Sequence, residues 1–491
     1  MAFVRLFVFL QNTTRLKKQT TYMKKTLSLL FFAALGVAAQ AQTARKLTVN
    51  LTPDGKANMQ VFLPENPSGR AVVGCPGGGY SHLSMQNEGT DWVDYFNRQG
   101  ITYCVLTYRM PKGDRTIPMS DAQNAIRTVR DSAEVWHVSP YDVGIMGFSA
   151  GGHLASTTAT HAPQDARPDF QILFYPVISM DERQTHKGSV KGFLGDNRGD
   201  EKLVKEFSND RQVKKHQTPP AIILMAGDDG AVPPMTNGIP YYMALRKAGV
   251  PAAMHIYPAG GHGFGFRTSF ACHDLMVDEL TTWLRQLPSV KPNARRVACV
   301  GNSITDGYGI DMADVNAYPA QLQRMLGTDY CVRNFGVSGR TMLNSGDRPY
   351  MKEQAWKDAK DFCPDIVVIK LGTNDSKARN WDGHEKDFAK DLQQMIDELK
   401  ALPSSPKIYL CNPIQSAPKR AADDSKQIRD SVVVAAIIPA IAKVAKKNKL
   451  EVIDLHPLID QTSDMMQRDG IHPTAKGAKK IAETVAGAIK I

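Results

Sequence analysis

The 491-residue chain lacks the spacings of cysteine and histidine that hold metal ions. Neither H-E-x-x-H nor a C-x-x-C pair occurs, so we predict no metal, and nothing in the sequence indicates a cofactor. The seven cysteines are an odd number, and the domains expected below are large enough not to need disulfides. Five of them lie in apolar, strand-like runs, where a free cysteine is a small buried hydrophobe: Cys75, Cys104, Cys299, Cys331 and Cys411.

Long apolar runs are also scarce, and the one such run lies near the start. Basic residues at 24–25, an apolar run at 27–35 and small residues at 39–41 are typical of a secretory signal peptide over residues 1–41. The run is shorter than the ~20 residues that span a bilayer. Met23 is a better start than Met1, so residues 1–22 are interpreted as an over-extended reading frame. We therefore expect a secreted or periplasmic protein without stable membrane insertion after cleavage.

Dense blocks of lysine and arginine interleaved with aromatic residues are absent, so nucleic-acid binding has no support. The net charge is +11, and it falls to +5 without residues 1–41, which carry six basic and no acidic side chains. An acidic polymer stays open as a partner. Because 491 residues exceed what one core usually organises, we expect two domains of roughly 200–250 residues each.

In the first region, over residues 42–287, short apolar runs alternate with stretches of helical periodicity. This alternation predicts βαβ units around a mostly parallel sheet with helices on both faces. Such sheets carry their sites at the carboxyl ends of the strands. The expected strands are 71–74, 101–108, 143–146, 170–177, 221–226 and 253–257, with helices near 89–98 and 122–136.

A G-x-S-x-G motif places Ser149 on a sharp turn directly after one of these strands. Upstream, the glycine-rich segment 76–80 follows another strand, so that the backbone N–H groups of Gly78 and Gly79, together with that of Ala150, are expected to stabilise an oxyanion. Downstream, segment 227–233 offers an acid and His262 offers a base. We expect His153, in the first helical turn after the serine, to be structural.

The order Ser, Asp, His resembles the α/β-hydrolase fold, and the Pro-Gly-Gly-Gly-Tyr segment resembles its acetyl-esterase and xylan-esterase-like branch, which is related to feruloyl esterases. The resemblance implies Asp229 as the acid, because in relatives the acid stands four residues before the proline of a Val-Pro pair. Asp228 is then a turn residue. Pro76 stands where many lipases carry a histidine, which disfavours the hormone-sensitive-lipase branch. Residues 178–218 form either part of a lid or a plain solvated segment.

Residues 288–294 contain two prolines and few apolar residues, so they are predicted to form a stiff linker. From Arg295 the strand–helix alternation resumes, with strands at 295–300, 365–371, 407–411 and 451–455. The sequence therefore predicts a second three-layer α/β domain, flavodoxin-like, over residues 295–491.

Four blocks in this second region carry chemistry: one at Ser303, then residues 334–339, 372–375 and 469–473. Together they resemble the SGNH (GDSL-type) hydrolase family. The resemblance implies Ser303 as the nucleophile, His472 as the base and Asp469 as the acid that orients it. It also implies an oxyanion hole made by the N–H groups of Ser303 and Gly336 and the side-chain amide of Asn374.

Both resemblances imply acyl transfer to water through an acyl-enzyme on serine. Combined with export, they predict an esterase with two independent sites that removes acetyl, and also feruloyl, groups from a plant polysaccharide such as xylan. The expected partner is thus an acylated polysaccharide or oligosaccharide. The alternatives are sialate O-acetylesterase or lipid or aryl esterase activity in the second domain, peptidase activity in the first, or one domain that only binds glycan.

Overall fold

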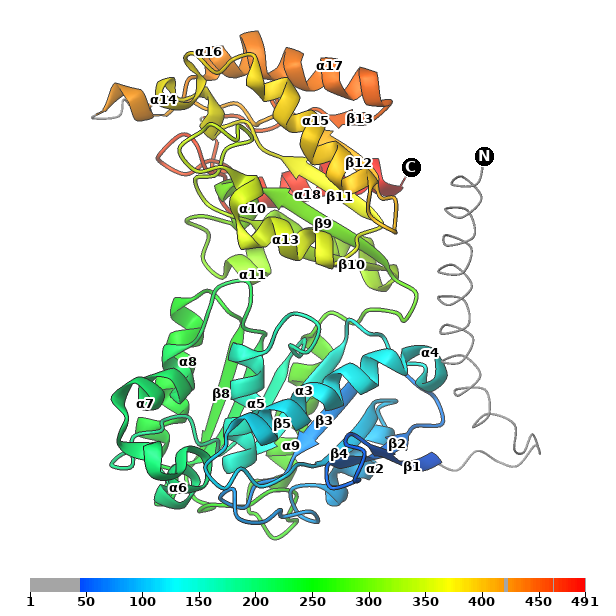
Figure 1. The fold of residues 1–491 in the computed structure, drawn as a ribbon, viewed down its shortest axis with the longest axis vertical. Coiled ribbons are helices and arrows are strands. Elements are labelled where there is room, and N and C mark those ends of the chain that lie inside the picture. The colour runs from blue at the N-terminus through cyan, green and yellow to red at the C-terminus, as the bar shows by residue number, and fades with distance from the viewer. Residues whose placement is uncertain (1–44, 419–422, 462, 491) are drawn as a thin grey trace, which may run out of the picture. The chain divides into compact units, whose positions relative to one another are not determined.

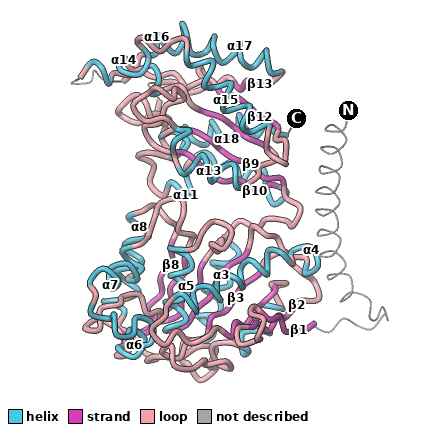
Figure 2. The backbone as a smooth tube through the Cα atoms, viewed as in Figure 1, coloured by secondary structure: helices cyan, strands magenta, loops and turns pink. Residues whose placement is uncertain are grey.

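The computed structural model describes residues 45–418, 423–461 and 463–490 (Figure 1). The predicted signal peptide over residues 1–41 lies outside these residues, so export stays a prediction. Within the described ranges, no helix is both long enough and apolar enough to cross a membrane. Figure 2 shows strands alternating with helices along most of the chain, as the sequence pattern predicts.

The first sheet has eight strands in the order β1-β2-β4-β3-β5-β6-β7-β8. From β4 to β8 neighbouring strands are parallel, whereas β1 and β2 pair antiparallel. The strands are β1 (Arg45–Asn50), β2 (Asn58–Leu63), β3 (Ala71–Cys75), β4 (Thr102–Thr107), β5 (Val143–Phe148), β6 (Gln171–Phe174), β7 (Ala221–Ala226) and β8 (Ala252–Tyr257). The six strands expected from the sequence are confirmed. The β1–β2 hairpin was not predicted, because β1 is an edge strand with no buried residue and β2 buries only Met59 and Val61, so neither strand is a continuous buried run.

The helices of this region include η1 (Thr90–Trp92), α2 (Val93–Asn97), α3 (Thr116–Asp131), α4 (Ala133–Trp136), α5 (Ala150–His161), α6 (Lys187–Leu194), α7 (Glu201–Phe207), α8 (Gly238–Lys247) and α9 (His273–Gln286). The expected helix at 122–136 begins earlier, at Thr116, and is interrupted at Ser132. It buries Ala122, Ile126 and Val129 at helical spacing. Short helices also occupy much of the segment 178–218, for which the sequence allowed either part of a lid or a plain solvated segment.

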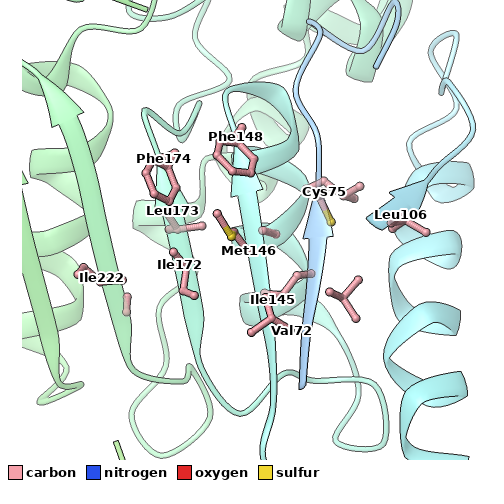
Figure 3. Close-up of a cluster of buried hydrophobic side chains, with 14 of the residues drawn as sticks. Val72, Cys75, Leu106, Ile145, Met146, Phe148, Ile172, Leu173, Phe174 and Ile222 are labelled. Carbon is pink, nitrogen blue, oxygen red and sulfur yellow. The ribbon is translucent and has the colours of Figure 1, made fainter. Parts of the chain in front are cut away.

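Apolar side chains cover both faces of the central strands, and every residue of β3, β5 and β6 is buried. This is the pattern of parallel strands covered by helices on both sides. Figure 3 shows part of this core, including Val72 and Cys75 of β3, Ile145, Met146 and Phe148 of β5, and Ile172, Leu173 and Phe174 of β6. The rings of Phe148 and Phe174 stack with centroids 4.9 Å apart. The loops at the carboxyl ends of these strands are therefore built on a densely packed base.

The second sheet has five parallel strands in the order β10-β9-β11-β12-β13. They are β9 (Arg295–Gly301), β10 (Tyr330–Gly336), β11 (Ile366–Lys370), β12 (Lys407–Cys411) and β13 (Glu451–Ile453). Its helices include α10 (Ser303–Asp306), α11 (Ala313–Asn316), α12 (Tyr318–Leu326), α13 (Gln354–Asp361), α14 (Ala378–Trp381), α15 (Asp387–Lys400), α16 (Asp430–Val432), α17 (Ile438–Asn448) and α18 (Ala475–Lys490).

Alternate residues of β9 enter two separate hydrophobic clusters on opposite faces of this sheet. Ala298 and Val300 pack in a cluster with residues of α15 and α17, whereas Val297 and Cys299 pack in a cluster with residues of α12 and α18. A parallel sheet between two helical layers is the three-layer architecture predicted from the sequence, so the α/β fold class is confirmed. The order of the strands puts β9 between β10 and β11, so the loops after these three strands lie at the same edge.

Candidate active sites

Ser149 lies on a strained turn between β5 and α5. Its backbone has φ +52° and ψ −118°, a conformation that costs a non-glycine residue about 1–3 kcal/mol. The flanking glycines are required by space, because a Cβ on Gly147 would lie 2.2 Å from the carbonyl oxygen of Gly151, and one on Gly151 would lie 2.1 Å from that of Cys75. The tight turn is the local structure that the G-x-S-x-G motif predicts.

The structure brings Ser149, His262 and Asp229 together. His262 Nε2 lies 2.8 Å from Ser149 Oγ, and His262 Nδ1 lies 2.7 Å from Asp229 Oδ2. Oδ1 of Asp229 accepts hydrogen bonds of 2.9 Å from the backbone N–H groups of Ala231 and Val232. The carboxylate is therefore held in place by its own loop, and it fixes the orientation of the imidazole.

The two residues expected to be bystanders have other partners. Asp228 accepts a hydrogen bond of 2.8 Å from the N–H of Gly261 and is not part of the triad geometry. His153 is fully buried, with Nδ1 bonded to the Tyr80 hydroxyl and Nε2 to the carbonyl of Phe207, both at 2.9 Å. Burial lowers the pKa of His153 to about 4, so it is a neutral structural residue at neutral pH.

The glycine-rich segment after β3 lies against the nucleophile. A Cβ on Gly77 would lie 3.0 Å from Cβ of Ser149, so this backbone approaches the serine closely. The N–H of Gly77 donates a hydrogen bond of 2.8 Å to Glu88 Oε2. The expected oxyanion donors are the N–H groups of Gly78, Gly79 and Ala150, and none of the three donates a hydrogen bond to a described residue.

Glu88 is a part of this site that the sequence did not indicate. The residue is 5% exposed, and its carboxylate also accepts a hydrogen bond of 2.8 Å from the Tyr175 hydroxyl, which in turn accepts one of 3.0 Å from the N–H of Gly265. The Tyr175 ring packs edge-on against His262 with centroids 4.9 Å apart. Burial raises the pKa of Glu88, against the lowering effect of its hydrogen bonds from Tyr175 and Gly77. One carboxylate thus connects the glycine-rich segment with the loop that carries the histidine.

Ser303, His472 and Asp469 come together in the second region. Ser303 begins α10 directly after β9, and its Oγ lies 2.8 Å from His472 Nε2. His472 Nδ1 lies 2.6 Å from Asp469 Oδ2, while Asp469 Oδ1 accepts the backbone N–H groups of Ile471 and His472 at 2.9 and 3.0 Å. Burial alone would raise the pKa of Asp469, but these hydrogen bonds outweigh it and lower the pKa. The acid is therefore a carboxylate at neutral pH.

Asn374 follows β11 and has its amide oriented by two partners. Its Oδ1 accepts a hydrogen bond of 2.8 Å from Lys377 Nζ, and its Nδ2 donates one of 3.1 Å to the carbonyl of Arg340. The second N–H of the amide stays free to bind an oxyanion. Burial is the main cause that lowers the pKa of Lys377. The sequence analysis did not identify Lys377 as part of the site.

Gly336 does not act as expected in this structure. Its N–H already donates a hydrogen bond of 2.8 Å to Asn334 Oδ1, so this N–H is not available to an oxyanion. A Cβ there would lie 2.2 Å from the N atom of Asp306, which shows that glycine is needed for the close packing of β10 on α10. Further along the same block, Gly339 has φ +82°, and its N–H is donated to no described residue. Gly339 is thus the candidate donor in this loop.

Asp375, next to Asn374, connects the loops that follow β10 and β11. It is fully buried and accepts the backbone N–H groups of Met342 and Leu343 at 3.1 and 2.8 Å. Burial raises its pKa to about 6 against the lowering effect of these bonds. The carboxyl group fixes the loop after β10 to the loop after β11.

All seven cysteines are free, and the five expected in strands are buried. Across residues 45–418, 423–461 and 463–490, no group of three or more His, Cys, Asp or Glu side chains is arranged to hold a metal ion.

Two Ser–His–Asp arrangements at the carboxyl ends of parallel strands define the class as serine hydrolase. Residues 72–266 match the alpha/beta hydrolase fold family, and residues 299–480 match the GDSL-like Lipase/Acylhydrolase family. The chain is 53% identical over 486 residues to an acetylxylan esterase of Xylanibacter ruminicola, covering 95% of this chain and all of that protein. It belongs to the same family as that protein and is a serine carboxylic-ester hydrolase.

Two further similarities cover parts of the chain. A stretch of 203 residues is 35% identical to endo-1,4-beta-xylanase B of Butyrivibrio fibrisolvens, covering 38% of this chain and 31% of that protein. Among solved structures, an acetyl ester-xyloside bifunctional hydrolase from Caldicellulosiruptor lactoaceticus is 30% identical, with a TM-score of 0.46, and covers 50% of this chain and 98% of its own.

Proposed function

We propose that this protein is a carbohydrate esterase that removes acetyl groups from xylan at two separate sites, Ser149 and Ser303. The observation that carries the proposal is that both serines have a histidine at 2.8 Å, which is itself bonded to a carboxylate. The Xylanibacter ruminicola relative, described as an acetylxylan esterase, supports acetylated xylan as the substrate.

The same reaction is proposed for each site. The serine Oγ attacks the acetyl carbonyl carbon while the histidine Nε2 takes its proton, and the carboxylate stabilises the imidazolium that forms. The bond between the acetyl carbonyl carbon and the sugar oxygen then breaks, and the histidine gives the proton to that oxygen. Water, activated by the same histidine, hydrolyses the acetyl-serine and releases acetate.

The developing oxyanion is bound differently at the two sites. At Ser149 the proposed donors are the N–H groups of Gly78, Gly79 and Ala150, supported by their lack of other acceptors among the described residues. At Ser303 they are the Ser303 N–H, the Asn374 amide and, in place of Gly336, the N–H of Gly339. Loss of one such donor typically lowers kcat by about 10²- to 10³-fold.

The organisation of the chain is part of the proposal. Residues 42–287 and 295–491 are two catalytic domains joined by the linker 288–294, and residues 1–41 direct export to the periplasm or beyond. An extracellular polymer as substrate is consistent with export. Feruloyl groups are a second acyl class proposed for the Ser149 site, on the resemblance of this region to feruloyl esterases.

Labelling with a fluorophosphonate tests whether both serines are activated. The reagent forms a covalent bond to a serine only where a base activates the hydroxyl, so peptide mapping should find label on Ser149 and on Ser303. His262→Ala should abolish labelling of Ser149 and spare Ser303, and His472→Ala should do the reverse. Label on one serine alone would contradict two catalytic sites and favour a glycan-binding role for the other domain.

A further inference from the structure

Tyr308 is an exposed aromatic residue beside the Ser303 triad. The residue is 54% exposed, whereas many tyrosines of this chain are fully buried. Its ring centroid lies 4.6 Å from that of His472, with 43° between the ring planes. Neither the proposed proton transfers nor the proposed oxyanion hole uses this side chain. An aromatic ring at the edge of an active site is a surface that a substrate can cover.

Backbone hydrogen bonds hold Tyr308 in place despite its exposure. Its N–H donates to the carbonyl oxygen of Ser303 over 2.9 Å, and its own carbonyl accepts from Gln467 Nε2 over 2.9 Å. Gln467 also bonds to the loop of the base, since its N–H donates to the carbonyl of His472 over 2.8 Å and its Nε2 to that of Pro473 over 2.9 Å. The backbone of Tyr308 is thus fixed relative to both the nucleophile and the base before any substrate binds.

The chemistry of the reaction places the leaving group on the same side. His472 returns its proton to the leaving oxygen, so that oxygen must come within about 3 Å of Nε2. In the deacetylation of a glycan the leaving oxygen is attached directly to a pyranose ring. A ring attached there lies beside the imidazole, and the exposed aromatic ring next to that imidazole is Tyr308.

We propose that Tyr308 forms a sugar-stacking subsite at Ser303, on which the acetylated pyranose packs its C–H face before the ester is cleaved. The proposal rests on the esterase function of Ser303 proposed above and adds that this site selects cyclic sugar alcohols over acyclic ones as leaving groups. Pyranose C–H groups carry partial positive charge and are attracted to the negative face of an aromatic ring. Packed pairs of aromatic rings gain about 0.5–1.5 kcal/mol, and a gain of the same size here corresponds to roughly 2- to 12-fold in binding.

The test uses the whole protein with Ser149→Ala, so that only Ser303 reacts. Tyr308→Ala, Tyr308→Phe and Tyr308→Trp are assayed for acetate release from acetylated xylo-oligosaccharide and from glycerol triacetate, an acyclic ester. The matched control is Val434→Ala, another apolar side chain that is 51% exposed. We expect Tyr308→Ala to raise KM for the oligosaccharide roughly 2- to 12-fold with a smaller change in kcat. The ratio of kcat/KM for the oligosaccharide to kcat/KM for glycerol triacetate should fall by the same factor. The Tyr308→Phe and Tyr308→Trp variants should keep this ratio near that of the parent.

Each other outcome has a defined meaning. Equal losses on both substrates would overturn the subsite and make Tyr308 a residue that positions His472. Unchanged ratios in all Tyr308 variants, as in Val434→Ala, would also overturn it. If the Ser149→Ala parent cleaves glycerol triacetate but not the oligosaccharide, the proposed glycan esterase function of Ser303 fails, and the subsite fails with it.

Discussion

Removing the Glu88 carboxylate should damage the Ser149 site without touching any residue of its triad. Glu88→Ala leaves two buried donors, the Gly77 N–H and the Tyr175 hydroxyl, without their acceptor. Each unsatisfied buried donor costs about 1–3 kcal/mol, so we expect a loss of roughly 2–6 kcal/mol in the free energy of unfolding. For a domain of this size that corresponds to a fall in melting temperature of at least about 4 °C.

The activity should fall as well, because Gly77 precedes the two expected oxyanion donors. If their N–H groups lose alignment, kcat at Ser149 should drop by about 10²-fold, the lower end of the cost of one lost donor. Glu88→Gln keeps the shape and one acceptor oxygen, so it should lose less of both stability and activity. The assay is kcat for acetate release in a Ser303→Ala background, with thermal unfolding measured on the same samples.

Measuring stability and kcat on the same Glu88→Ala samples separates two explanations. If Glu88→Ala keeps kcat within about twofold and its melting temperature is unchanged, the bonds from Gly77 and Tyr175 carry none of the energy assigned to them. If stability falls but kcat does not, Glu88 supports the fold alone, and the link from the carboxylate to the oxyanion loop is refuted.

Two further predictions concern the second site. Lys377→Met removes the cation that orients the Asn374 amide, so kcat at Ser303 should fall about tenfold or more in a Ser149→Ala background. Lys377→Arg keeps the cation and should lose less activity. Equal rates in the two variants would refute this role. The pKa of Asp375 is about 6 in the folded protein against an ordinary 3.8, so the folded protein binds the proton more tightly than the unfolded chain does. The contribution of Asp375 to the free energy of unfolding therefore falls as the pH rises from about 3.8 to about 6. Asp375→Asn should therefore gain about 3 kcal/mol relative to wild type between pH 3.8 and 7 in urea unfolding, and a pH-independent difference would contradict the raised pKa.

Much of the fold follows from local sequence, since the buried parallel strands are continuous apolar runs and helices fill the gaps between them. The Ser303 triad was predicted from the resemblance of its four blocks, and the Ser149 triad from a local motif as well. A nucleophile on a strand–helix turn needs small neighbours, so it leaves a readable motif around Ser149, and the acid and base follow other strands in order. The strands β1 and β2 were missed because β1, at the sheet edge, has no buried residue and β2 buries only Met59 and Val61.

Residues whose roles depend on specific side-chain contacts left no such signal. Glu88 and Tyr175 are 87 positions apart and meet only in the folded chain. Lys377 lies three positions beyond Asn374, but only the structure shows that its ammonium group binds the amide oxygen. The expectation for Gly336 failed because the side chain of Asn334, two residues earlier, takes its N–H, a local contact that spacing alone does not reveal.

The most direct test of two independent esterase sites is acetate release from native acetylated xylan by wild type, Ser149→Ala, Ser303→Ala and the double variant. We predict that each single variant loses part of the release, that the two losses differ in the sugar positions deacetylated, and that the double variant releases nothing. If one single variant matches wild type and the other matches the double variant, only one serine acts on xylan, and the proposal of two sites is contradicted.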